Sequence, residues 1–260
     1  MLPWVDLPLV GLSVEPYALV QTFYLLAAVV LTARLHRRAG VDVETTVGAF
    51  VVGIPAGLLG ARLVHLAEYR AAGETLATAG YASYGGYLGG FAALLVYSRL
   101  RGISALRFLD AGAPSMALAE AIARIGCFLA GCCHGVPWDG ALAVTFPAGS
   151  VAFRDQLAHG QLSPGATHSL PVHPVQLYGT AVMAVVFVAL WRLHGRGRRP
   201  EGVLFFAFLA LYGVLRSMLL PLRADAHALQ AAFGVAFLIA GLAGLLWRLA
   251  PAVRDRSATA

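Results

Sequence analysis

Long apolar stretches separated by short polar segments are the main feature of the chain. Seven of them approach the roughly 20 residues that a helix needs to cross the hydrocarbon core of a bilayer. Each is predicted to be helical, because lipid offers no hydrogen-bond partner to free backbone groups. The pattern therefore predicts an all-α integral membrane protein with seven transmembrane helices. The stretches cover residues 17–35, 45–66, 80–98, 111–132, 174–192, 202–221 and 229–249.

The distribution of the arginines predicts how these helices are oriented. Thirteen of the nineteen follow the first, third, fifth and seventh stretches, whereas Arg70, Arg154 and Arg223 follow the even-numbered ones. Positive charge beside membrane helices collects on the cytoplasmic side. We therefore expect the N-terminus outside, the C-terminus in the cytoplasm, and residues 1–260 to form a single transmembrane domain.

The overall composition agrees with a membrane protein and argues against another class. Hydrophobic residues make up 59% of the chain and charged residues only 12%, which is unlike a soluble protein. A net charge of +6 would otherwise suggest nucleic acid, but topology already accounts for the arginines. No nucleic-acid partner and no cofactor are predicted.

One polar segment is long enough to form a structure of its own. Residues 136–172 contain four prolines and several glycines and are predicted to be a small external cap, with a possible strand at ALAVTFP. The next helix begins with polar side chains that either cap it or face a ligand. These side chains are His173, Gln176 and Tyr178.

Three more arginines lie inside apolar stretches, where a charge costs at least about 2.5 kcal/mol on insertion scales. They are Arg62, Arg124 and Arg216, each expected towards the outer end of its helix. Such residues mark functional sites unless they extend to the interface. We expect them to converge on an outward-facing cavity, because guanidinium groups suit a phosphate or a phospholipid headgroup. Glu120, one helical turn before Arg124, either belongs to this site or only neutralises the arginine.

The third apolar stretch contains glycines at small-xxx-small spacing. Gly85 and Gly86 are followed by Gly89 and Gly90, a pattern that permits close helix packing. The alternative is a backbone that approaches a lipid headgroup. Tyr84, directly before the first pair, is either an interfacial anchor or a hydroxyl of the site.

All three cysteines lie together at the end of the fourth stretch. Cys127, Cys132, Cys133 and His134 follow one another in the pattern Cys-x4-Cys-Cys-His. Structural zinc sites usually take paired cysteines from two separate elements, so no metal is predicted. Cys127 is expected to pack as a small apolar residue. Cys132 and Cys133 are candidates for thiol chemistry, because the imidazole of His134 can accept a thiol proton.

Several segments taken together resemble the prolipoprotein diacylglyceryl transferases of bacterial inner membranes. They are GLSVEPYALV, LLGARL, YGGYLGG, LDAGAPSMALAEAIARIGCFLAG, AVTFP, HPVQLYG and LYGVLR, in that order along the chain. The resemblance implies transfer of a diacylglyceryl group from phosphatidylglycerol in the outer leaflet to a lipobox cysteine of a secreted preprotein, with release of glycerol phosphate. It also implies that Arg124 and Arg216 hold the lipid phosphate, and it matches Tyr17 and Arg62 to residues of the first and second family helices.

The chain departs from the family pattern on the side of the site that handles the acceptor. The family histidine of H-G-G is Tyr84 here, and a phenol is a poor base at neutral pH. The family asparagine is Cys127, and acidic positions of the family are Cys132 and Leu220. The leading hypothesis is therefore a transferase that uses an anionic phospholipid as donor and an acceptor that need not be a lipobox cysteine.

The remaining roles and alternatives follow from this hypothesis. His134 would replace the family base, or Glu120 would do so if burial raises its pKa. One alternative is the family reaction with Tyr84 and a water as the base, and another is a catalytically silent lipid-binding protein. A thiol-linked or redox role is a third. The expected location is the bacterial cytoplasmic membrane, with the site facing the outer leaflet.

Overall fold

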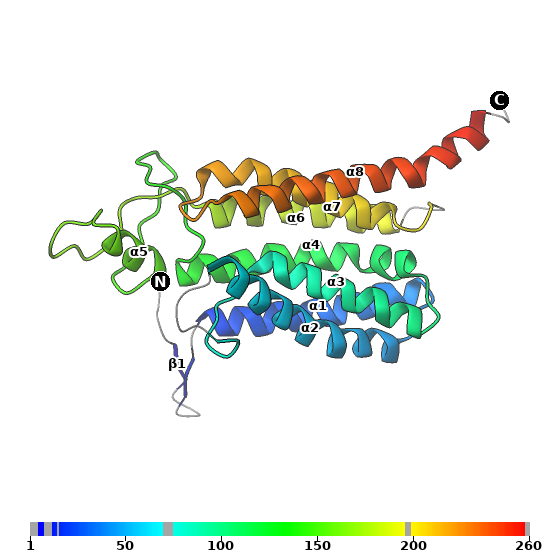
Figure 1. The fold of residues 1–260 in the computed structure, drawn as a ribbon, viewed down its shortest axis with the longest axis horizontal. Coiled ribbons are helices and arrows are strands. Elements are labelled where there is room, and N and C mark those ends of the chain that lie inside the picture. Colours follow the sequence, from blue (N-terminus) through cyan, green and yellow to red (C-terminus); the bar gives the residue numbers. More distant parts are fainter. Residues whose placement is uncertain (1–4, 8–11, 15, 70–74, 196–198, 258–260) are drawn as a thin grey trace. The chain divides into compact units, whose positions relative to one another are not determined.

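The computed structural model describes residues 5–7, 12–14, 16–69, 75–195 and 199–257, and nearly all of its regular structure is helical (Figure 1). A helix occupies each of the seven predicted apolar stretches. These are α1 (Pro16–Arg38), α2 (Val43–Tyr69), α3 (Ser83–Leu100), α4 (Ala105–Ala130), α6 (Val175–His194), α7 (Val203–Leu219) and α8 (Ala228–Ser257). The pattern did not predict the short antiparallel pair of β1 (Val5–Leu7) and β2 (Leu12–Val14), nor the short helix α5 (Val151–Ala158).

Six of the long helices have the length and the hydropathy needed to cross a membrane. They also expose large apolar side chains, such as Phe23, Val51, Val185 and Leu246, as lipid-facing helices do. The protein therefore has the structure of an all-α integral membrane protein. The exception is α3, whose 18 residues include four glycines and three tyrosines. A seventh span and the orientation of the termini stay predictions.

The contacts within the chain divide it into two compact units. Unit 1 comprises 1–28, 114–197 and 207–243, and unit 2 comprises 29–113, 198–206 and 244–260. Helices α1, α4, α7 and α8 contribute residues to both units. The single transmembrane domain stays a prediction, and each unit is described by itself below.

In unit 2 the glycines of α3 allow its backbone to pack closely on α2, and Figure 1 shows the two helices side by side. A Cβ on Gly85 would lie 2.4 Å from the carbonyl oxygen of Gly60, and one on Gly89 would lie 2.4 Å from that of Ala56. Side chains larger than hydrogen are excluded at these points. The close-packing interpretation of this glycine motif is confirmed.

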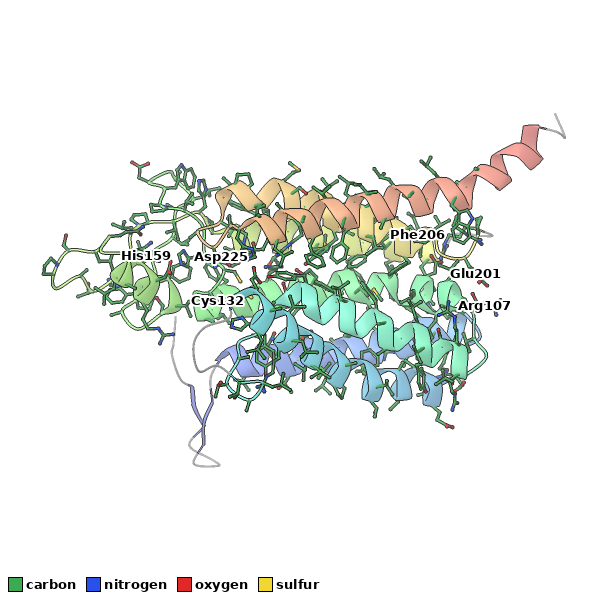
Figure 2. The ribbon with its side chains drawn as sticks, viewed as in Figure 1. Arg107, Cys132, His159, Glu201, Phe206 and Asp225 are labelled. Atoms are coloured by element: carbon green, nitrogen blue, oxygen red, sulfur yellow. The ribbon has the colours of Figure 1, made fainter. Side chains whose placement is uncertain are left out.

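The start of α7 in unit 2 is fixed by a carboxylate from α4. Asp110 Oδ1 accepts hydrogen bonds from the backbone N–H groups of Leu204 at 2.6 Å and Phe205 at 3.2 Å. These donors belong to the first turn of a helix, where no intrahelical partner exists. In the segment before α7, Glu201 accepts from Arg107 Nε at 2.6 Å (Figure 2) and from Ser104 Oγ at 2.7 Å.

In unit 1 the segment predicted as a cap has a small core of its own. Phe146, Ala152 and Val172 are buried together, with Phe128 packed against them. The possible strand at ALAVTFP is not a strand here, because its pairing is limited to isolated bridges such as Val144 with Val172. Helix α5 begins at a Ser150 cap, whose hydroxyl accepts from the N–H of Phe153. That the segment lies outside the membrane stays a prediction.

Replacing Asp110 by alanine tests how strongly this carboxylate anchors α7. Two N–H groups would lose their acceptor in a poorly hydrated place, so we expect Asp110→Ala to destabilise the protein by about 1–3 kcal/mol. In Asp110→Asn the side chain has the same shape and keeps one acceptor oxygen, so this variant should lose less stability. Thermal unfolding of the detergent-solubilised protein measures both. An alanine variant with an unchanged midpoint would contradict this account of α7.

Candidate phosphate-binding site and thiol cluster

The site in unit 1 begins with an ion pair on α4. Glu120 and Arg124 are four residues apart, so both side chains lie on the same face of the helix. The carboxylate oxygen Oε1 of Glu120 accepts from Arg124 Nε at 2.9 Å and from Nη2 at 2.5 Å. Their side chains are only 12% and 15% exposed. The pair neutralises a charge that would otherwise be costly in an apolar helix.

Beside this ion pair lies a pocket of about 350 Å³, a volume that includes open solvent at its mouth, called the arginine pocket below. Helices α4, α6 and α7 and the segments that follow α4 and α7 contribute to its wall. The stem of Arg124 passes close to Gly179, where a Cβ would come within 3.6 Å of Arg124 Cγ. The lining residues are Arg124, Cys133, Val175, Gln176, Gly179, Leu215, Arg216, Leu219 and Arg223.

The second arginine of the pocket, Arg216, differs from Arg124 because no described carboxylate pairs with its guanidinium group. No described residue forms a hydrogen bond or an ion pair with its guanidinium group. It projects from α7, which packs tightly on α8, since a Cβ on Gly213 would lie 2.4 Å from the backbone nitrogen of Leu238. The structure thus holds a half-buried positive charge in the wall of a pocket without a partner, which favours binding of an anion there.

A third arginine lines the same pocket, and the sequence interpretation did not include it in the site. Arg223 follows α7 and forms two bonds to Asp225, with Nε 2.8 Å from Oδ1 and Nη2 2.6 Å from Oδ2. Its backbone pairs with Gly135 in an isolated bridge. Arg223 lies four residues after Leu219, the last residue of α7. The sequence interpretation used it only to predict the orientation of the helices. Three guanidinium groups and no acidic residue therefore line the pocket.

The three cysteines of unit 1 form a compact group, called the thiol cluster below. The sulfurs of Cys127, Cys132 (Figure 2) and Cys133 all lie within 4.8 Å of one another, and none is in a disulfide. The chain leaves α4 through Gly131, with φ of 72°. Cys133 has φ of 54°, a backbone conformation that residues other than glycine rarely adopt. This turn directs Cys133 into the wall of the arginine pocket.

The pKa values of the two cysteines beyond the end of α4 shift in opposite directions. Hydrogen bonds from the thiols of Cys127 and Cys132 hold the pKa of Cys133 well below its usual range, and Arg223 and Arg124 contribute to this. The pKa of Cys132 is raised, because its thiol donates to the other two sulfurs and is partly buried. The thiolate of the cluster is therefore favoured at Cys133.

His134 is adjacent to the cluster in sequence but is engaged elsewhere. Its Nδ1 donates to the carbonyl oxygen of Gly135 at 3.1 Å, and its Nε2 lies 3.3 Å from Asp155 Oδ2. It is buried and does not line the arginine pocket. Both ring nitrogens thus have partners within unit 1.

The polar residues at the start of α6 divide between the pocket and the cap segment. Gln176 lines the arginine pocket and donates from Nε2 to the carbonyl oxygen of Cys132 at 2.8 Å. The ring of His173 stacks on Trp138 with centroids 4.2 Å apart, and Tyr178 contacts the edge of the same ring. Of this group, only Gln176 is a wall residue of the pocket.

Four predicted site residues belong to unit 2, and two of them, Tyr84 and Arg62, form polar contacts there. The phenol of Tyr84 donates to Glu68 Oε2, and Tyr84 is almost fully buried. Arg62 donates to the carbonyl oxygen of Leu76 at 2.7 Å and to the hydroxyl of Tyr81 at 2.8 Å. Glu68 was not among the predicted site residues, since only the fold brings it to Tyr84 across 16 positions.

A comparison with protein families matches residues 5–247 to the family model described as prolipoprotein diacylglyceryl transferase. The chain belongs to this family. Its similarity extends to named enzymes of the family. A phosphatidylglycerol–prolipoprotein diacylglyceryl transferase of Clostridium tetani is 30% identical over 84% of this chain and 84% of its own length. Proteins of the same name from Dehalococcoides mccartyi and Leifsonia xyli are 28% and 26% identical over 70% and 85% of this chain, and over 67% and 68% of their own lengths.

In this member of the diacylglyceryl transferase family, the structure brings together part of the predicted site. Arg124, Arg216, Gln176 and Cys133 line one pocket, and the other two cysteines adjoin Cys133. Arg62, Tyr84, Gly85 and Gly86 are described in unit 2, so convergence of all three arginines stays a prediction. The side chain of Tyr17 lies outside the described part of the chain. The functional roles assigned to all of these residues likewise stay predictions.

The cysteines of this family member should differ in their rate of alkylation. At neutral pH, iodoacetamide should label Cys133 before Cys132, because only the thiolate attacks. As the pH rises, labelling of Cys132 should increase, whereas that of Cys133 should already have reached its plateau. Tandem mass spectrometry of the labelled peptide distinguishes the two positions, and the denatured protein is the control. Equal rates in the folded protein would contradict the assigned thiolate.

Proposed function

We propose that the protein is a phospholipid-dependent transferase that moves a diacylglyceryl or related lipid group from an anionic phospholipid to an acceptor that need not be a lipobox cysteine. The observation that carries this proposal is the arginine pocket. Arg124 and Arg216 line it, and among the described residues Arg216 has no anionic partner. A phosphodiester is an anion that two guanidinium groups bind well.

In the proposed reaction, the two arginines stabilise the leaving group of the donor lipid. The bond between the glyceryl carbon of the diacylglyceryl group and the phosphate oxygen breaks, a bond from that carbon to the acceptor forms, and the acceptor proton passes to a base. The electron pair leaves with glycerol phosphate when phosphatidylglycerol is the donor. Arg124 and Arg216 stabilise the negative charge that grows on this leaving group. Leu215 and Leu219 in the pocket wall suit the apolar part of the lipid.

The relatives and the helices support the proposed substrates and location. The relatives carry names that specify phosphatidylglycerol and prolipoprotein, which supports phosphatidylglycerol as the donor and a secreted preprotein as one possible class of acceptor. Bacterial relatives and six apolar helices support a multi-pass protein of the cytoplasmic membrane. We place the pocket at the outer leaflet.

The acceptor must lose a proton to a base, and His134 and Glu120 are the first candidates. His134 and Glu120 both have partners, so either must exchange its present contact to accept a proton. A specific contact favours a second candidate, namely the family reaction with Tyr84 and a water as the base. Since Glu68 accepts from the phenol, the carboxylate can take up the proton that the phenol passes on. Cys132 and Cys133 remain candidates for thiol chemistry.

Arg216 gives the sharpest test of the donor site. Removing a donor that stabilises a developing charge costs about 10²- to 10³-fold in kcat, so we expect Arg216→Gln to lose lipid turnover by that order. Its fold should be intact, because the guanidinium has no described partner to lose. Arg124→Ala should lose turnover as well, but it also removes the ion pair with Glu120.

Turnover is measured by incubating the purified protein with phosphatidylglycerol and analysing the products by mass spectrometry. Arg154→Gln, on the exposed face of α5, is the matched control. If Arg216→Gln and Arg124→Ala turn over lipid as fast as the parent protein, the donor assignment is wrong. If the parent protein retains bound lipid in native mass spectrometry but never consumes it, the protein is a silent lipid-binding protein.

A complementation experiment distinguishes the two acceptor hypotheses. In cells depleted of their own prolipoprotein diacylglyceryl transferase, we expect no rescue by this protein, because the family histidine and two acidic positions are replaced. Rescue would refute the altered acceptor. In that case Tyr84→Phe should abolish rescue, because it removes the proposed base while leaving the ring in place. Arg154→Gln again serves as the control.

A further inference from the structure

The thiol cluster contains every cysteine of the chain, and the transferase reaction proposed above assigns it no necessary step. Cys127 comes from the last turns of α4, whereas Cys132 and Cys133 follow the end of that helix. Spacings of five and six residues do not place side chains on one face of a regular helix. The three sulfurs nevertheless lie within 4.8 Å of one another, so the convergence comes from the turn and not from helical periodicity.

The backbone around the cluster is held in the conformation that gathers the sulfurs. Gly131 ends α4 in the left-handed region, and the N–H of Cys132 donates to the carbonyl oxygen of Cys127 at 3.1 Å. Gln176 Nε2 donates to the carbonyl oxygen of Cys132 from α6. Cys133 keeps a positive φ, which costs energy and persists only where surrounding contacts enforce it.

The distances fit a metal ion bound by sulfur. With metal–sulfur bonds of about 2.3 Å, as in zinc thiolates, ligand sulfurs lie about 3.8 Å apart around a tetrahedral ion and about 4.0 Å apart around a trigonal one. The sulfurs of the cluster are at most 4.8 Å apart, so each sulfur would need to move by less than about an ångström to reach these distances. Thiolates select soft ions such as monovalent copper and zinc.

The number of ligands decides between these ions. His134 would be the obvious fourth ligand, but its nitrogens face Gly135 and Asp155. Glu120 is bound to Arg124. The group of potential ligands among the described residues contains the three cysteines alone. A structural zinc ion takes four ligands, whereas monovalent copper is satisfied by soft sulfur donors in smaller number.

We propose that Cys127, Cys132 and Cys133 form a three-coordinate binding site for monovalent copper. Binding forms three copper–sulfur bonds and releases the thiol protons to solvent, with no change in oxidation state. The resulting centre is anionic, and Arg124, Arg216 and Arg223 line the pocket that Cys133 borders. Only Glu120 and Asp225 offset these arginines in the described structure, so the local charge favours an anionic metal–thiolate centre.

A titration of the full-length protein tests this site without any enzyme assay. The reduced, detergent-solubilised protein is titrated anaerobically with monovalent copper against the competing chelator bicinchoninate. We expect one copper ion per chain, and X-ray absorption should show three sulfur neighbours at about 2.3 Å, as in metal thiolates. Each of Cys127→Ser, Cys132→Ser and Cys133→Ser should weaken binding at least about 100-fold, because losing a ligand costs at least as much as the roughly 10- to 100-fold lost with an outer-shell partner. His159→Ala, at an exposed histidine of the cap segment, is the control and should bind as the parent does.

A second measurement covers the case in which the serine variants do not fold. Copper bound to the parent protein should protect all three cysteines from N-ethylmaleimide, and removing the ion with bicinchoninate should restore labelling. The proposal is overturned if the parent protein takes up no copper in competition with bicinchoninate. It is also overturned if copper leaves any one of the cysteines as reactive as before, or if zinc with four ligands displaces copper.

Discussion

A positive charge inside an apolar helix must be compensated, and the arrangement of unit 1 depends on how this is done. Arg124 is neutralised within α4 by Glu120 one turn earlier, and Arg223 is neutralised two residues later by Asp225. Neither pair reaches across to Arg216. The arginine pocket therefore keeps one guanidinium group uncompensated among the described residues, and this charge gives the pocket its preference for anions.

The second requirement is that backbone groups at the end of α4 find partners. The chain satisfies it by pairing with the segment after α7, since Val136 donates to the carbonyl oxygen of Leu222 and Ala224 donates to that of His134. This pairing brings Arg223 to the pocket from the segment after α7 and Cys133 from the segment after α4. A hydrogen-bonding need of the main chain thus completes a site whose first two arginines come from helices.

Sequence pattern predicted those features that depend on composition along a single helix. The seven helices and the Glu120–Arg124 pair follow from apolar stretches and from four-residue spacing. The pocket member Arg223 and the Tyr84–Glu68 contact depend on turns that join separate elements, for which no periodic signal exists. The same reason explains why α5 was not predicted. Its eight residues are specified by the Ser150 cap and by burial under Phe146, and not by a long apolar face.

The family resemblance predicts an amide and an acid where this chain has Cys127 and Cys132, and such a difference bears on the charge of the arginine pocket. A carboxylate at position 132 would compensate an arginine permanently, whereas a thiol does so only when it loses its proton or binds a metal ion. While Cys127 and Cys132 are protonated, the three guanidinium groups of the lining face only one thiolate, that of Cys133, which leaves positive charge for the phosphate of a lipid. When Cys127 and Cys132 also lose their protons or bind a metal ion, the same arginines gain a stronger internal partner. Because Cys133 lines the pocket, the charge of the thiol cluster bears on how strongly the arginine pocket attracts an anion.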